Sequence, residues 1–275
     1  MRSTSDGLII KERASGESDK LLTVLTADRG KILICAKGVR SLKSKNASIC
    51  RAFTYANLEY YEKNGMFWLA SGEVKEHFLT LGTPLEALSL AAYIADVADE
   101  LSGENFSDTT LLRLLLNTFF AIENSLRPYP LIKGAFEFFA AAHAGFAPDL
   151  SSCEKCGKGI GDTDKMVLDV MNGSLLCSEC IADKRIPLTN EIAEYDRFET
   201  KNVLLPVTPE VIMAIRYAVS ADLKRLYSFT LNKESDLSLF SSAGEVYLQN
   251  HLERGFDTLD FYREIKSLPT MNTKK

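Results

Sequence analysis

The first 80 residues show short apolar runs separated by turn residues, a pattern that predicts β-strands. After the apolar run "GLIIKE", the stretch 20–38 ("KLLTVLTADRGKILICAKG") contains two predicted strands around the turn "ADRG". Two more are predicted in 53–74, joined at Asn64-Gly65, because both central residues of a type I′ turn need positive φ. "SGEVKEHF" (71–78) is a plausible fifth strand.

Five short antiparallel strands in about 80 residues predict a small closed barrel, and the OB-fold is the obvious candidate. An SH3-like barrel or a small sandwich is the alternative.

After residue 82 the apolar spacing becomes helical. Thr83 is a possible N-cap, and Pro84 stands where the first turn of a helix tolerates proline. We expect helices in 85–101, 107–126, 129–146, 208–220 and 243–256. No segment holds the roughly 18 uninterrupted apolar residues of a membrane span, and the N-terminus has no long apolar leader. We therefore expect a cytoplasmic protein.

Four of the six cysteines form two close pairs, "CEKC" and "CSEC". The spacing C-x2-C-x20-C-x2-C is that of a zinc site with four thiolates. Between the pairs, "KMVLDVMNGSLLC" predicts a strand, a turn at Asn172-Gly173 and a second strand, which returns the second pair to the first. The predicted metal ligands are Cys153, Cys156, Cys177 and Cys180.

We expect this zinc to be structural, because four thiolates leave no open position for water. Disulfides would need an oxidising compartment, and a thioredoxin-like motif would need one pair in a βαβ setting. Of the two other cysteines, Cys35 lies in an apolar strand and is expected in the core. Cys50 adjoins Arg51 and is either a thiolate of lowered pKa or an accessible thiol.

The sequence carries no recognisable catalytic motif. None of its three histidines, His77, His143 and His251, falls in a nucleophile or metal motif. The glycine patterns that cradle nucleotide phosphates are also missing. We therefore expect a protein that binds rather than catalyses.

Charge is unevenly distributed along the chain. Seven of the 32 basic residues, and no acidic residue, lie in 29–58, which leaves 25 basic against 37 acidic side chains elsewhere. In an OB barrel this stretch is a strand and the connection that follows it, on or beside the usual nucleic-acid face. The residues predicted to bind DNA are Lys31, Lys37, Arg40, Lys43, Lys45 and Arg51. Six aromatic residues nearby in the sequence include some that could stack on bases.

The residue order resembles the RecO family of bacterial DNA repair and recombination mediators. The matching segments are "AKGVRSLKSKN", "FTYANLEYY" and "GFAPDLSSCEKCG", followed by "CSEC". The third is the most specific, because a G-[FY]-x-P-x-L approach to the first cysteine pair is typical of that family. The resemblance covers nearly the whole chain and weakens after about residue 190.

The resemblance implies an N-terminal OB-fold, a helical C-terminal domain and a structural zinc module. It implies a non-enzymatic protein that binds single- and double-stranded DNA and promotes strand annealing. With RecR, such proteins help load RecA onto DNA coated by single-strand binding protein, whose acidic C-terminal tail docks on the helical domain. The basic element around Gly38 and the four paired cysteines match the family's DNA-binding element and zinc ligands.

The sequence thus predicts an α+β chain: an OB-fold domain (1–82), a helical domain in two parts (83–150 and 183–275) and an inserted zinc ribbon (151–182). Such a protein would be cytoplasmic and associated with the nucleoid. The alternative is a zinc-ribbon interaction scaffold or transcription-associated factor whose basic loop binds an acidic partner.

Overall fold

A computed structural model describes residues 2–41, 43–80, 82–104, 106–161, 165–184 and 203–268. The chain divides into two compact units, one formed by residues 1–124 with 256–275 and the other by residues 125–255. None of the helices in these ranges is long and apolar enough to cross a membrane. The predicted start of the second helical part, at residue 183, borders 185–202, which lie outside the described residues.

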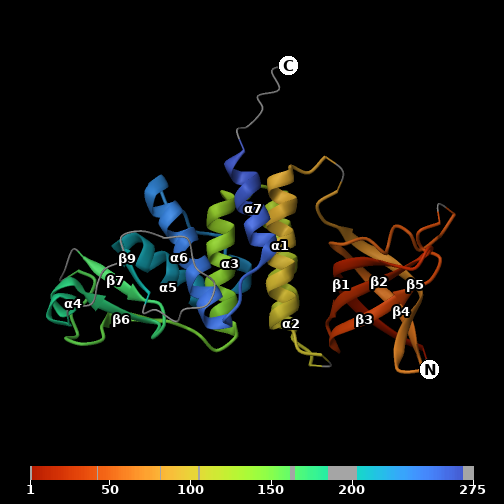
Figure 1. The fold of residues 1–275 in the computed structure, drawn as a ribbon, viewed down its shortest axis with the longest axis horizontal. Helices are drawn as coiled ribbons and strands as arrows, with labels where there is room; N and C mark the ends of the chain where they lie inside the picture. The colour runs from red at the N-terminus through yellow and green to blue at the C-terminus, as the bar shows by residue number, and fades with distance from the viewer. Residues whose placement is uncertain are drawn as a thin grey trace, which may run out of the picture. The chain divides into compact units, whose positions relative to one another are not determined.

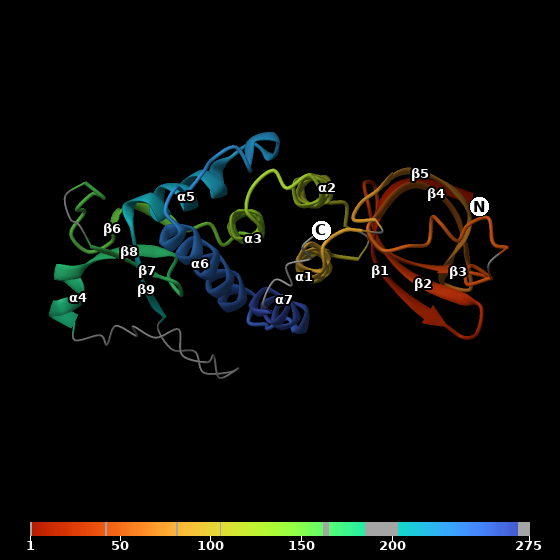
Figure 2. The same cartoon turned by 90° about the horizontal axis from the view of Figure 1, so that it is seen from above.

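The first unit begins with a closed five-stranded barrel, as predicted (Figure 1). Its strands are β1 (Arg2–Ser15), β2 (Asp19–Thr26), β3 (Gly30–Ala36), β4 (Thr54–Lys63) and β5 (Met66–His77). They follow the order β1-β2-β3-β5-β4 around the barrel axis, along which Figure 2 looks approximately. β1 pairs with β4 over residues 2–8 and with β2 over residues 7–15, and its pairing with β2 has a register shift between Ile9 and Lys11. This is the OB-fold.

The individual strands differ from the expectation in three ways. The stretch 71–78 is not a separate fifth strand, because β5 runs on to His77 across register shifts in its pairing with β4. The strand that completes the five is β1, at the N-terminus, which is much longer than the apolar run "GLIIKE" within it. The barrel closes through a short parallel pair of β3 with β5, in which Ile34 faces Phe67, so the sheet is not wholly antiparallel.

The barrel core consists of the inward-facing positions of the strands together with part of the connection after β3. Val39, Ile49 and Cys50, all from that connection, are buried in the same cluster as the strand residues. The expectation for Cys50 was wrong in both of its forms. Its side chain is fully buried, and burial raises the pKa of its thiol to about 12.

Three helices complete the first unit: α1 (Leu85–Leu101), α2 (Thr109–Glu123) and α7 (Asp257–Ser267). Asp108 caps α2 by accepting a hydrogen bond from the Leu111 N–H (2.9 Å). The sequence pattern did not predict α7, which packs on α1 (Figure 1). There the Thr258 hydroxyl donates to Asp96 at 2.6 Å.

Two lysines of the barrel are ion-paired with α1. Lys11 Nζ lies 2.7 Å from Asp99 Oδ2 and also contacts Asp96, and Lys31 Nζ lies 3.0 Å from Asp99 Oδ1. All four side chains are at most a quarter exposed. Burial opposes ionisation of Asp99, but the two lysines outweigh it and lower its pKa.

The second unit combines helices α3 (Tyr129–His143), α4 (Ser178–Lys184), α5 (Pro209–Ser220) and α6 (Glu234–Leu252) with a four-stranded sheet. The sheet has the order β6-β8-β7-β9. Its strands are β6 (Asp149–Cys153), β7 (Met166–Asp169), β8 (Ser174–Cys177) and β9 (Leu204–Val207). The predicted strand-turn-strand is the hairpin β7–β8, and α6 begins nine residues earlier than the predicted 243.

A buried ion-pair network joins α3 to α6 where the helices cross. Lys133, only 2% exposed, contacts Glu137 at 3.0 Å and Glu245 at 2.8 Å. The backbones approach closely, because a Cβ on Gly244 would lie 3.2 Å from the Cα of Gly134. The charge of Lys133 therefore serves the packing of this unit.

Candidate functional site

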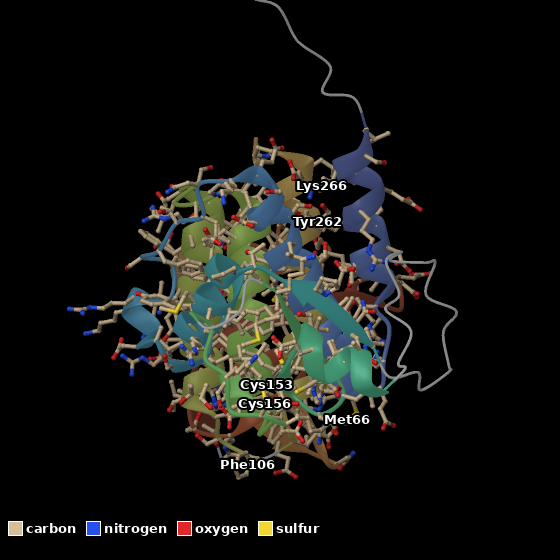
Figure 3. All side chains as sticks on the ribbon, turned by 90° about the vertical axis from the view of Figure 1, so that its left-hand side faces the viewer. Met66, Phe106, Cys153, Cys156, Tyr262 and Lys266 are labelled. Atoms are coloured by element: carbon tan, nitrogen blue, oxygen red, sulfur yellow. The ribbon has the colours of Figure 1, made fainter. Side chains whose placement is uncertain are left out.

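The four paired cysteines come together as predicted. Their sulfur atoms all lie within 4.8 Å of one another, and Cys156 Sγ is 3.6 Å from Cys177 Sγ. Four thiolates arranged tetrahedrally at ~2.3 Å from a zinc ion have sulfurs about 3.8 Å apart. Figure 3 labels Cys153, the last residue of β6, and Cys156 close to it. The arrangement can hold one metal ion, and it leaves no open coordination position.

Local backbone structure places each pair of cysteines. After Cys153 the chain turns tightly, with the Gly157 N–H donating to the Cys153 carbonyl at 2.8 Å and Gly157 at φ +74°. The hairpin β7–β8 then returns Cys177 to Cys153, and the Cys177 N–H donates to Cys153 Sγ at 3.3 Å. Across the two turns, Lys158 pairs with Glu179 at 2.6 Å.

The surroundings of the sulfurs favour a thiolate at Cys153. Burial opposes its ionisation, but N–H donors from Cys177, Cys156 and Lys155 lower its pKa to about 6. Hydrogen bonds with Cys177 and Cys156 raise the pKa of Cys180 to about 12. Such N–H···S contacts orient and support metal-bound thiolates.

The basic loop, defined as residues 37–53 between β3 and β4, is fastened to the barrel. The Gly38 N–H donates to Asp19 Oδ1 at 2.8 Å, and this bond lowers the pKa of Asp19. The Arg40 guanidinium donates to the Gly16 carbonyl at 2.9 Å. With Val39, Ile49 and Cys50 in the barrel core, the loop presents charged side chains from a backbone anchored at these points.

Five of the six predicted DNA-binding residues lie on this loop or at its ends, and all five are exposed. They are Lys37, Arg40, Lys43, Lys45 and Arg51. Among the described residues, none of the five forms an ion pair with a carboxylate. Of the barrel's exposed carboxylates, Glu62 lies on β4 and Glu73 and Glu76 lie on β5. Glu17 is also exposed and lies in the turn beside Gly16, whose carbonyl accepts from Arg40.

The sixth predicted residue, Lys31, is placed differently. Its ammonium pairs with Asp99 and also donates to the Asp99 carbonyl oxygen at 2.6 Å. A lysine committed to a partly buried carboxylate presents less charge to an approaching phosphate. The structure therefore separates Lys31 from the exposed five.

The three histidines all have structural neighbours. His77 Nδ1 lies 3.1 Å from the Thr54 hydroxyl, and His251 Nε2 lies 2.9 Å from the Val170 carbonyl. Burial lowers the pKa of His251, although the Val170 contact opposes this. His143 stacks on an aromatic ring of its own helix. None of these contacts joins a histidine to a nucleophilic side chain in a catalytic arrangement.

These features define a class: an OB-fold protein with an exposed basic loop, joined to a helical domain with a four-cysteine cluster that can hold a metal ion. Residues 1–78 match the family model described as "Recombination protein O N terminal", and residues 83–260 match "Recombination protein O C terminal". The chain belongs to the recombination protein O (RecO) family of DNA repair proteins, as its sequence motifs predicted.

Curated relatives agree with this assignment over almost the full chain. The DNA repair protein RecO of Acetivibrio thermocellus is 28% identical over 95% of this chain and 96% of its own length. That of Clostridium acetobutylicum is 23% identical over 98% and 97%, and that of Halalkalibacterium halodurans is 26% identical over 88% and 87%.

Proposed function

We propose that this protein is a non-enzymatic DNA-binding mediator of repair and homologous recombination. It binds single- and double-stranded DNA and promotes the annealing of complementary strands. With RecR it helps load RecA onto DNA covered by single-strand binding protein. Family membership supports the role in DNA repair, and the exposed basic loop is the observation that carries DNA binding.

The loop suits a phosphate backbone in three respects. Its charges are exposed, none of them forms an ion pair with a carboxylate among the described residues, and they extend from a backbone bonded to the barrel. Each phosphate contact releases counterions, so binding should weaken steeply as salt rises. We assign these contacts to Lys37, Arg40, Lys43, Lys45 and Arg51, with a smaller contribution from Lys31.

The metal site supports folding rather than chemistry in this proposal. Four thiolates would hold zinc in a closed coordination sphere, and such an ion contributes its binding energy to the folded state. The cysteines lie in the second unit, whereas the basic loop lies in the first. We therefore expect the zinc to stabilise the part of the chain that meets protein partners.

The proposed partners follow from the family. They are RecR and the acidic C-terminal tail of single-strand binding protein, and the protein would work in the cytoplasm with the nucleoid. Lys133 is a basic residue of the helical domain, but it is buried in its own ion-pair network and cannot reach such a tail. Basic residues other than Lys133 must therefore bind the acidic tail.

The test is fluorescence anisotropy of a labelled single-stranded oligonucleotide across a salt series. We compare the natural chain with a Lys43→Ala/Lys45→Ala/Arg51→Ala variant. The log–log salt slope should fall by ~0.7 for each lost phosphate contact, or about 2 in total.

The matched control is Lys224→Ala/Arg225→Ala/Lys233→Ala, which removes the same charge from exposed positions of the second unit. Its slope should stay close to that of the natural chain. Absence of binding at low salt would overturn the proposal and favour an acidic protein partner for the loop.

A further inference from the structure

Four residues form one continuous row on the outside of the barrel. In register, Leu21 of β2 faces Cys35 of β3, Cys35 faces Trp68 of β5, and Trp68 faces Tyr61 of β4. The adjacent positions in each strand point inward, so this row points outward, although Cys35 itself is buried. We call these four residues the outer row.

Large apolar side chains continue the outer row on one side, because β3 and β5 run parallel there. Leu33, two residues before Cys35, is 49% exposed, and Met66, two residues before Trp68, is 47% exposed. Side chains two positions apart in a strand share a face. The barrel therefore presents an apolar, partly aromatic surface across β3 and β5.

Trp68 is the chain's only tryptophan, and its ring meets the basic loop. Lys37 Nζ lies 4.7 Å from the ring centroid. Because Lys37 is itself exposed, its ammonium marks the face of the ring that solvent reaches. The indole N–H is buried and has no hydrogen-bond acceptor among the described residues. The ring is thus set edge-in, with its face rather than its polar atom available for contact.

The basic loop continues past this ring. Asn46 Nδ2 donates to the Ala70 carbonyl of β5 at 3.3 Å, two residues beyond Trp68. Phosphates held by the loop would therefore place their bases near β5. The next outward residue of β4, Glu59, is bonded to Arg2 and Ser71, which offsets its charge towards a nearby phosphate.

We infer that the outer row, with Trp68 at its centre and Tyr61 beside it, is the platform on which unpaired bases of single-stranded DNA stack. Lys37 leaves the ring for a phosphate when a base takes its place. This assignment rests on the proposed function and deepens it, because it names the residues that distinguish single strands from duplexes. Bases of an intact duplex are already stacked on one another and cannot reach the ring.

The first measurement needs no variant. Because Trp68 is the sole tryptophan, its fluorescence reports directly on this surface. A short oligothymidylate should quench it at saturation, whereas a blunt duplex of equal length should change it little. An oligonucleotide with abasic sugars has the same phosphates but no bases, and it should also leave the fluorescence nearly unchanged.

The second measurement compares Trp68→Ala with Tyr55→Ala by anisotropy. Tyr55 is a matched control, because it is another partly exposed aromatic of the barrel with a lysine, Lys75, 5.5 Å from its ring. Trp68→Ala should weaken binding of oligothymidylate about 5- to 150-fold with an unchanged salt slope, since stacking releases no counterions. Tyr55→Ala should change it less than twofold.

The abasic oligonucleotide should bind Trp68→Ala and the natural chain with the same affinity. Removing the bases and removing the Trp68 ring abolish the same stacking contact. Trp68→Phe, which keeps a ring without the buried N–H, controls for folding through its melting temperature. It should bind more tightly than Trp68→Ala.

Two kinds of failure can be told apart. If the natural chain binds DNA through the basic loop but Trp68→Ala binds oligothymidylate normally and quenching is absent, the stacking platform is wrong and the proposed function stands. If the natural chain binds no DNA at low salt, both are wrong. Equal losses of single-strand and duplex affinity in Trp68→Ala would also overturn the platform.

Discussion

Gly30, in the turn between β2 and β3, meets two constraints at one residue. Its φ is +65°, a left-handed conformation that side chains disfavour. A Cβ there would also lie 2.0 Å from the backbone oxygen of Phe106, in the connection between α1 and α2. That connection is bonded to the turn, because the Ser107 hydroxyl donates to the Ala27 carbonyl at 2.7 Å. A missing side chain thus allows the barrel and the helices of the first unit to touch.

We predict that Gly30→Ala costs about 2–5 kcal/mol of the free energy of unfolding, from backbone strain plus steric overlap. Gly65→Ala is the matched control, because Gly65 has φ +74° but a Cβ there would meet no atom within 4 Å. It should cost only the strain of about 1–2 kcal/mol. Urea unfolding followed by Trp68 fluorescence reports on the barrel, and equal losses in the two variants would contradict the steric contribution.

At the scale of elements, the contact between β3 and α1 determines what Lys31 can do. Its ammonium is held by Asp99, which Lys11 of β1 also contacts, so one carboxylate ties two strands to one helix. Removing a lysine from a partly buried pair leaves the carboxylate less well compensated. Lys31 should therefore matter more to stability than to DNA.

We predict that Lys31→Ala lowers the free energy of unfolding by about 1–3 kcal/mol and changes the salt slope of DNA binding by less than ~0.3. Lys45→Ala, which removes an exposed lysine of the basic loop, should show the reverse, with little loss of stability and a slope smaller by ~0.7. Urea unfolding measures the loss of stability in each variant, and the anisotropy salt series measures its salt slope. A slope smaller by ~0.7 in Lys31→Ala would show that its pair with Asp99 opens for DNA.

At the scale of the whole molecule, the two units carry different chemistry. The basic loop, the outer row and the sole tryptophan all belong to the unit of residues 1–124 and 256–275. The four clustered cysteines, which can hold a metal ion, belong to the unit of residues 125–255. Spectroscopic probes can therefore follow the two units separately.

We predict that Cys177→Ala abolishes zinc binding and lowers the melting temperature of the second unit, because a closed metal site contributes its binding energy to folding. Metal analysis and far-UV circular dichroism measure the two effects. The unfolding seen by Trp68 fluorescence should not move, and DNA affinity should stay within twofold.

Ser152→Ala is the control for that variant, since Ser152 precedes Cys153 but is not part of the sulfur cluster. It should retain one zinc ion per chain. Zinc loss from Cys177→Ala without any fall in melting temperature would show that the ion is not structural.

Much of this protein was determined by the sequence alone, because the relevant interactions are local. Alternation and the Asn64-Gly65 turn predicted the strands of the barrel, since pleat and turn geometry depend on adjacent residues. The spacing of the cysteine pairs around a predicted hairpin was enough to place four sulfurs together. The cluster of basic residues without acids was visible before any fold was known.

Only the tertiary structure decided which of these side chains are available. Burial of Cys50, capture of Lys31 by α1 and the packing of α7 on α1 each involve segments distant in the sequence. The same holds for the closure of β3 on β5, which places Trp68 beside Cys35 and under Lys37. Local patterns report which residues share a face of an element, but burial and pairing depend on what the rest of the chain brings against that face.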